Sequence, residues 1–146
     1  WMEEFSKIAF ENNIVYSEEN FFGSSLWHPP GVEFDNSVLE PTFEHIPADR
    51  VEVVIKFFEE FEKYHPEDAW YLPFIAVDPS QQRKGIGSFL LKEALKMIDE
   101  KGDRAYLEAS NELNKALYER HGFVEIGRVQ FEDSPPAFPM IRESIK

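Results

Sequence analysis

The chain has 146 residues, of which 42% are hydrophobic and 15% aromatic, and its net charge is −13. This length and composition predict one folded domain over residues 1–146 and exclude a disordered tail. The negative charge argues against nucleic-acid binding, which needs a basic face. Residues 1–69 hold 4 Lys and Arg against 16 Asp and Glu, whereas residues 70–146 hold 11 against 12. The acidic half either serves solubility or attracts a cationic substrate.

The chain contains no cysteine, so its own residues form no disulfide, thiolate metal site or acyl-cysteine intermediate. The first residues lack the basic and apolar regions of a signal peptide, and no apolar run approaches a membrane span. We therefore expect a cytoplasmic protein that does not enter a membrane. No two of the four histidines stand at metal-ligand spacing, so we expect no metal.

The first half of the chain predicts two helices around a strand pair. Apolar residues at helical spacing predict helices over residues 2–12 and 50–64. Residues 14–17 and 24–27 read as a hairpin of two short strands. Residues 31–47 follow a Pro-Pro-Gly run and are expected to be mostly loop.

The second half predicts alternating strands and helices. An apolar run at residues 70–77 predicts a central strand, and Pro73 inside it predicts a bulge or a splayed strand pair, because proline cannot donate to a ladder. The remaining predicted elements are a helix ending at Gly102, a strand at 105–109, a helix from an Asn111 cap to about residue 121, and strands at 123–131 and 138–143. This order is typical of an α/β (α+β) layered fold.

A loop with two glycines, QRKGIGS at residues 82–88, lies between the central strand and the next helix. A dinucleotide-binding loop would need glycine in place of Leu90, and a Walker loop would need Gly-Lys-Ser/Thr, so neither reading fits. Glycines at a helix start let backbone N–H groups approach an anion, and Arg83 and Lys84 add positive charge. A tight turn with solvated cations is the alternative.

Two segments resemble the GNAT superfamily of N-acetyltransferases. Residues 77–91 resemble its acetyl-CoA motif, Gln/Arg-x-x-Gly-x-Gly/Ala, although Arg83 stands where related proteins often carry glycine. Residues 111–123, NELNKALYERHGF, are similar to its later Asn and Tyr-x-x-x-Gly-Phe element. Residues 70–73 and 134–140 look most like the branch that includes puromycin N-acetyltransferase. The resemblance covers roughly the last half of the chain, and the superfamily's first strand and helix could be missing here.

The resemblance implies a mixed, mostly antiparallel sheet with helices on both faces and a splayed central strand pair. The pantetheine arm of acetyl-CoA would lie in the opening of that pair. Asn111 would bind it or would act only as a helix cap. The residues expected to bind acetyl-CoA are Ile75, Ala76, Val77, Gln82, Arg83, Lys84, Gly85, Ile86, Gly87, Ser88, Asn111 and Asn114.

The resemblance also implies direct attack of a primary amine, on a small molecule or a peptide, on the thioester of bound acetyl-CoA. Tyr118 is the expected general acid, and a core tyrosine with a satisfied hydroxyl is the alternative. Glu108 is the candidate general base, with Glu67 and Asp68 as further candidates; each could instead be an ordinary surface carboxylate. A homodimer stays open. A second hypothesis is a non-catalytic acyl-CoA-binding sensor or regulatory domain.

Overall fold

The computed structural model describes residues 2–32, 44–132 and 134–145. The predicted loop at residues 31–47 therefore lies largely outside the described residues. The elements are α1 (Met2–Glu11), β1 (Val15–Ser17), β2 (Gly23–His28), α3 (Val51–Glu62), β3 (Ala69–Val77), the short 3-10 helix η2 (Pro79–Gln81), α4 (Ile86–Lys101), β4 (Arg104–Ala109), α5 (Glu112–Glu119), β5 (Val124–Glu125) and β6 (Phe138–Arg142). The predicted elements are present, and one of them, the strand at 123–131, is much shorter than expected.

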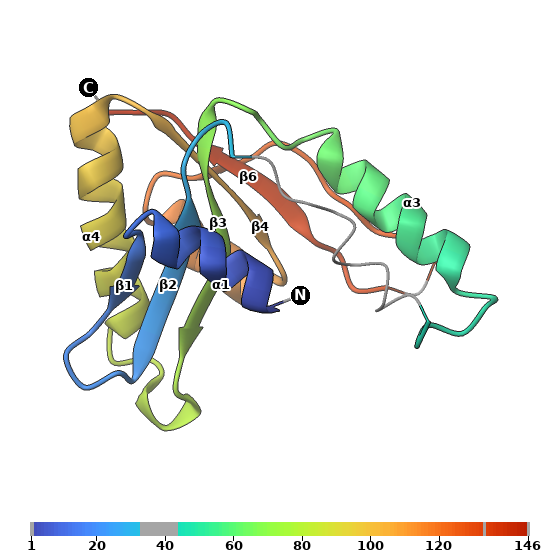
Figure 1. Cartoon of the computed structure of the whole chain (residues 1–146), viewed down its shortest axis with the longest axis horizontal. Coiled ribbons are helices and arrows are strands. Elements are labelled where there is room, and N and C mark those ends of the chain that lie inside the picture. Colours follow the sequence, from blue (N-terminus) through green and yellow to red (C-terminus); the bar gives the residue numbers. More distant parts are fainter. Residues whose placement is uncertain (1, 33–43, 133, 146) are drawn as a thin grey trace.

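The six strands form one sheet in the order β1-β2-β3-β4-β6-β5. Only β3 and β4 are parallel, and every other neighbouring pair is antiparallel. Figure 1 shows α1 crossing in front of the sheet, with α4 running along its far side. The predicted fold class, a mixed and mostly antiparallel sheet with helices, is confirmed.

The core lies between the sheet and α4. Helix α4 buries the stripe that the sequence predicts, which includes Leu91, Ala94, Leu95 and Ile98, and it ends at Gly102, whose φ of 78° suits a residue without a side chain. From the sheet, every second residue of β4 reaches the same cluster. These are Ala105, Leu107 and Ala109. The residues between them, Tyr106 and Glu108, therefore face the other side of the sheet.

Strands β3 and β4 pair over only three residues each. Ala69, Trp70 and Tyr71 of β3 face Arg104, Ala105 and Tyr106 of β4, and no pairing follows although both strands continue. On its other edge β3 pairs with β2, with a shift in register between Leu26 and His28, opposite Phe74 and Tyr71. Pro73 lies at both irregularities, so the predicted bulge and the predicted splay both occur there.

The prediction of a strand over residues 123–131 was wrong in its length. Strand β5 covers Val124–Glu125, and beyond it only scattered bonds to the β6 region occur, such as Ile126 N–H to the Pro139 oxygen at 2.9 Å. The ring of Tyr64 occupies the place where a side chain at Gly127 would lie. This contact between distant segments interrupts the regular ladder, which continues as an isolated bridge between Val129 and Ala137.

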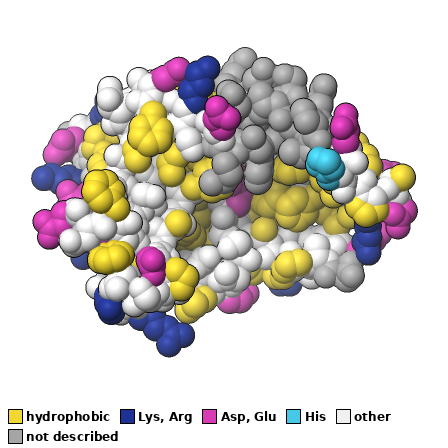
Figure 2. All heavy atoms as spheres, turned by 60° about the horizontal axis from the view of Figure 1, so that its bottom comes forward, with side chains coloured by type: hydrophobic (Ala, Val, Ile, Leu, Met, Phe, Trp, Pro, Cys, Tyr) yellow, Lys and Arg dark blue, Asp and Glu magenta, His cyan; other side chains and the backbone are white. Residues whose placement is uncertain are grey.

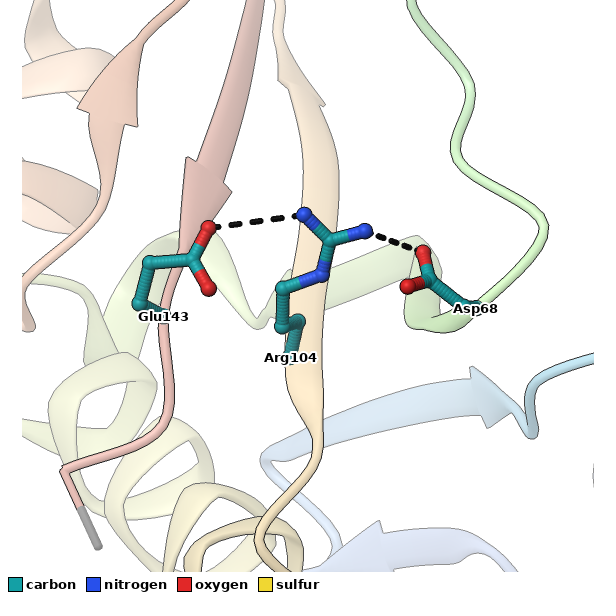
Figure 3. A network of polar contacts seen from close by, with 3 residues as sticks. All are labelled: Asp68, Arg104 and Glu143. Atoms are coloured by element: carbon teal, nitrogen blue, oxygen red, sulfur yellow. Dashed lines mark hydrogen bonds and ion pairs between the residues drawn. The ribbon is translucent and has the colours of Figure 1, made fainter.

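The paired end of β3 and β4 is fastened by side chains. Arg104, at the start of β4, forms ion pairs with Asp68 before β3 and with Glu143 after β6, the latter at 3.5 Å (Figure 3). Both partners raise the pKa of the Arg104 guanidinium. In addition, the Trp70 indole N–H donates to the Asp103 carboxylate at 2.9 Å. We call Ala69–Tyr71 with Arg104–Tyr106 the closed half, and Leu72–Val77 with Leu107–Ala109 the open half.

Candidate functional site

A groove of about 620 Å³ lies between the open half of β3, the start of α4 and helix α5. Eleven of the predicted site residues line it: Ile75, Ala76, Val77, Gln82, Arg83, Gly85, Ile86, Gly87, Ser88, Asn114 and Tyr118. Figure 2 brings the end of the molecule that carries the glycine loop towards the viewer, and hydrophobic side chains gather in the hollows of that face. The structure thus brings two sequence motifs to one cavity.

The groove also has lining residues that sequence reasoning missed. Leu113 and Leu117 lie on the groove side of α5, Arg120 follows the helix directly, and Gln81 lies in η2. Leu113 is 75% exposed. The spacing of 113, 117 and 120 follows one face of a helix, and this periodicity could have predicted them.

The glycine loop presents backbone donors to the groove. Gly85 precedes α4 with a φ of 88°, and the first bond of the helix runs from Phe89 N–H to the Gly85 oxygen at 2.9 Å. The N–H groups of residues 86–88 consequently have no acceptor within the helix, and they lie at its positive end. Arg83 also has a positive φ, of 63°. Lys84 does not line the groove, and its ammonium bonds the Gln81 side chain at 2.8 Å.

The edge of β3 that faces β4 supplies further backbone groups. Gly23 to Leu26 of β2 pair with Val77 to Phe74 along one edge of β3, and within residues 2–32, 44–132 and 134–145 no strand pairs with the opposite edge beyond Tyr71. An extended chain with amide groups could pair with this free edge as an added strand does.

The two asparagines take different places. The Asn111 side chain accepts from the Asn114 N–H at 2.9 Å and caps α5, and Asn111 does not line the groove. Asn114 does line it, and its side-chain amide donates to the Ser110 hydroxyl at 3.0 Å. The geometry thus supports the capping alternative for Asn111 and favours Asn114 as the residue that meets a ligand.

Tyr118 is buried, packs edge-on against Phe123, and still lines the groove. Burial raises the pKa of its hydroxyl to about 12, so the group stays protonated at neutral pH. The hydroxyl is not among the fully enclosed polar atoms that lack a partner in the described residues. Because Tyr118 lines the groove, a ligand bound there would lie against this side chain, and its role as general acid stays a prediction.

Glu108 lies in the open half of β4, on the sheet face opposite the α4 core. Part of the residue reaches the surface, but the carboxyl is deeply enclosed, and burial raises its pKa to about 7. The hydroxyls of Tyr71 and Tyr106 lower the pKa of Glu108, but by less than burial raises it. The other two candidate bases, Glu67 and Asp68, stand before β3 at the closed half, and Asp68 is paired with Arg104. None of the three carboxylates, Glu108 included, is among the residues that line the groove.

Among the described residues, no three His, Cys, Asp or Glu side chains are gathered as metal ligands would be. No helix in the same residues has the length and apolar character that crossing a membrane requires.

Comparison with known proteins agrees with this geometry. The family described as "Acetyltransferase (GNAT) domain" matches residues 58–144. An uncharacterized N-acetyltransferase of Schizosaccharomyces pombe is 30% identical over 125 residues, which are 76% of this chain and 51% of that protein. The chain thus spans about half the length of that relative. A putative phosphinothricin acetyltransferase of Bacillus subtilis is 39% identical over 36% of this chain and 34% of its own length.

Solved structures resemble the chain over most of its length. A structure titled histone acetyltransferase HPA2 and related acetyltransferase, from Corynebacterium glutamicum, is 25% identical and has a TM-score of 0.60, covering 90% of this chain and 64% of its own. A mosquito arylalkylamine N-acetyltransferase like 5b has a TM-score of 0.67 at 17% identity, over 97% of this chain and 80% of its own, and so agrees in fold. The chain belongs to the GNAT acetyltransferase family.

Proposed function

We propose that the protein transfers an acetyl group from acetyl-CoA to a primary amine by direct attack, with both substrates bound together. One observation carries the proposal: the backbone pairing of β3 and β4 stops between a protonated tyrosine on one face of the sheet and a titratable glutamate on the other. Tyr118 lines the groove on the α4 side, and Glu108 lies on the opposite face, outside the residues that line the groove. In the proposed reaction the acetyl group lies between the two residues, at the unpaired half of the two strands.

The hydrogen-bond donors that line the groove match the acceptors of acetyl-CoA. Its pyrophosphate would meet the N–H groups of residues 86–88 and the charge of Arg83, and its pantetheine amides would meet the free edge of β3 at Ile75, Ala76 and Val77. A volume of about 620 Å³ is within the ordinary range for a small-molecule site. Asn114 lines the same groove and would bond this arm.

The two titratable residues would then serve the two proton transfers. A lysine-like amine is charged at pH 7, and its neutral form costs roughly 4.6 kcal/mol. Glu108, with a pKa of about 7, takes the ammonium proton. The amine nitrogen bonds to the acetyl carbon, the carbon–sulfur bond breaks, and Tyr118 gives its proton to the departing thiolate. The second proton that the nitrogen loses on becoming an amide returns Tyr118 to its protonated form, and Glu108 releases the first proton to water. The products are an amide and free CoA.

The amine that accepts the acetyl group is proposed here as a class and not as one compound. The mosquito neighbour is titled an arylalkylamine N-acetyltransferase, and one from Escherichia coli is titled a ribosomal-protein-S18-alanine N-acetyltransferase. Small-molecule and peptide amines are accordingly both candidates here. The resemblance to the puromycin N-acetyltransferase branch, a cytoplasmic location and a homodimer stay predictions.

The test measures thiol release from acetyl-CoA with a panel of arylalkylamines, polyamines and N-terminal peptides. We expect turnover with at least one amine, and a fall in kcat of about 10²- to 10⁴-fold for Tyr118→Phe and for Glu108→Gln. Tyr64→Phe is the control, because Tyr64 is partly buried but does not line the groove. Tight CoA binding without thiol release for any amine would instead indicate the sensor alternative.

A further inference from the structure

The last paired residues of β3 and β4 are both tyrosines. Tyr71 and Tyr106 are direct partners in the parallel ladder, and their ring centroids lie 6.0 Å apart. Beyond them the strands separate. Glu108 follows Tyr106 by two residues and so shares its face of the sheet. The carboxyl thus lies immediately past the point where backbone pairing stops, beside two phenol rings.

Both phenol hydroxyls act on this carboxyl. Each lowers the pKa of Glu108, against the larger effect of burial. The Tyr106 hydroxyl is buried and has no hydrogen-bond partner within ordinary distance limits. It is the one buried side-chain polar atom of this kind among the described residues. A buried hydroxyl without a close partner is costly, which points to a role beyond packing.

The other groups around this site carry no fixed positive charge. From β2, His28 packs edge-on against Tyr71 at 6.0 Å, and His65, which follows α3, lies 4.6 Å from Tyr71 and 5.0 Å from Tyr106. Tyr64 interacts with Tyr106. On β6, the residue opposite Glu108 is Pro139. No Lys or Arg is among the described groups that act on the Glu108 pKa.

We propose that Tyr71 and Tyr106 are positioning residues that hold the ionised Glu108 carboxylate at the mouth of the open half and so make it usable as the base. Their hydroxyls donate to the carboxylate when it is charged and ready to accept a proton. Without these donors, burial alone would keep the carboxyl protonated at neutral pH. This inference rests on the proposed function only in the identity of Glu108 as the base.

The direct test is a pH titration of the Glu108 side-chain carboxyl by ¹³C NMR, assigned with Glu108→Gln, in the free protein. We expect Tyr71→Phe and Tyr106→Phe each to raise the midpoint by about one pH unit, a tenfold rise in proton affinity, with Tyr71→Phe the larger. Tyr64→Phe is the matched control from the same cluster and should leave the midpoint in place. If buried Tyr106 does not tolerate replacement, the partly exposed Tyr71 carries the test.

The pH profile of kcat/KM separates this inference from the proposed function. If both hold, the acidic limb moves upward in the two variants by the same amount as the NMR midpoint, while the KM for acetyl-CoA stays the same. A midpoint that moves without the acidic limb would uphold the tyrosine contact and remove Glu108 as the base. An unchanged or lowered midpoint in both variants, or an equal shift in Tyr64→Phe, would overturn the inference.

Discussion

The closed and open halves of the β3–β4 pair show how one strand pair can serve two purposes. In the closed half, three ladder positions, the Arg104 ion pairs and the Trp70–Asp103 bond hold the strands together. In the open half, Pro73 stands where pairing ends, and the free edge of β3 borders the groove. The contrast indicates that side-chain fastening at one end allows unpaired backbone at the other, where a ligand can take the place of a strand.

The largest expected effect concerns the buried carboxyl of the open half. Because the folded pKa of Glu108 is raised to about 7 from an ordinary value near 4.5, the folded protein is most stable when Glu108 is protonated. Stability from this group is lost as the pH rises from about 4.5 through 7. We expect Glu108→Gln to raise the free energy of unfolding at pH 8 by up to about 3 kcal/mol and to change it little at pH 4.5.

Chemical denaturation of both proteins at the two pH values measures this difference. The same substitution should lower kcat by about 10²- to 10⁴-fold, so the variant would be more stable and less active. An equal stability change at both pH values would show that the carboxyl has no raised pKa.

The next effect compares the two loop glycines. An alanine at Gly85 would need a φ of 88°, whereas a Cβ at Gly87 would make ordinary contacts, 3.7 Å from Leu117 and 3.8 Å from Val77. We expect Gly85→Ala to weaken acetyl-CoA binding about tenfold, since the strain of about 1–2 kcal/mol would displace the donors of residues 86–88. Calorimetry should show a change of less than about threefold for Gly87→Ala; equal losses would place the ligand elsewhere.

A substitution in the closed half should lower the stability of the protein and leave catalysis unchanged. We expect Arg104→Ala to lower the free energy of unfolding by about 1 kcal/mol, because its ion pairs are partly exposed, and to leave kcat unchanged. Arg50→Ala, which removes an exposed ion pair with Glu132, is the control with a smaller expected loss. Urea denaturation and the thiol-release assay measure the two quantities. A large fall in kcat for Arg104→Ala would mean that the two halves are not separable.

The smallest expected effect is at Arg83. Its positive φ strains an arginine, so Arg83→Gly should raise the free energy of unfolding by up to about 1 kcal/mol. The same change removes a charge beside the proposed pyrophosphate position and should raise the KM for acetyl-CoA a few-fold. Thermal unfolding measures the expected gain in stability, and steady-state kinetics measure the expected rise in the KM for acetyl-CoA. A stability loss would show that Arg83 makes a contact worth more than the strain.

Local sequence patterns predicted the features that depend on residues near one another in the chain. The apolar stripes gave α3 and α4, the glycines marked helix ends, and Pro73 alone predicted the splay. Contacts between distant segments could not be predicted in this way. The packing of Tyr64 on Gly127 interrupted a strand that periodicity favoured, and the meeting of Tyr71, Tyr106 and Glu108 depends on the register of a parallel pair. Sequence motifs led to most of the groove, but they did not distinguish the two asparagines: Asn111 uses its side-chain oxygen to cap α5, whereas Asn114 lines the groove.

Binding of acetyl-CoA at the open half is tested most directly by titrating the ¹⁵N-labelled protein with acetyl-CoA and following the amide chemical shifts. We expect large shifts for Ile75 to Val77 and for Gly85 to Ser88, and small ones for Ala69 to Tyr71 and Arg104 to Tyr106. Saturating shifts confined to the closed half, or no shifts at millimolar acetyl-CoA, would contradict it.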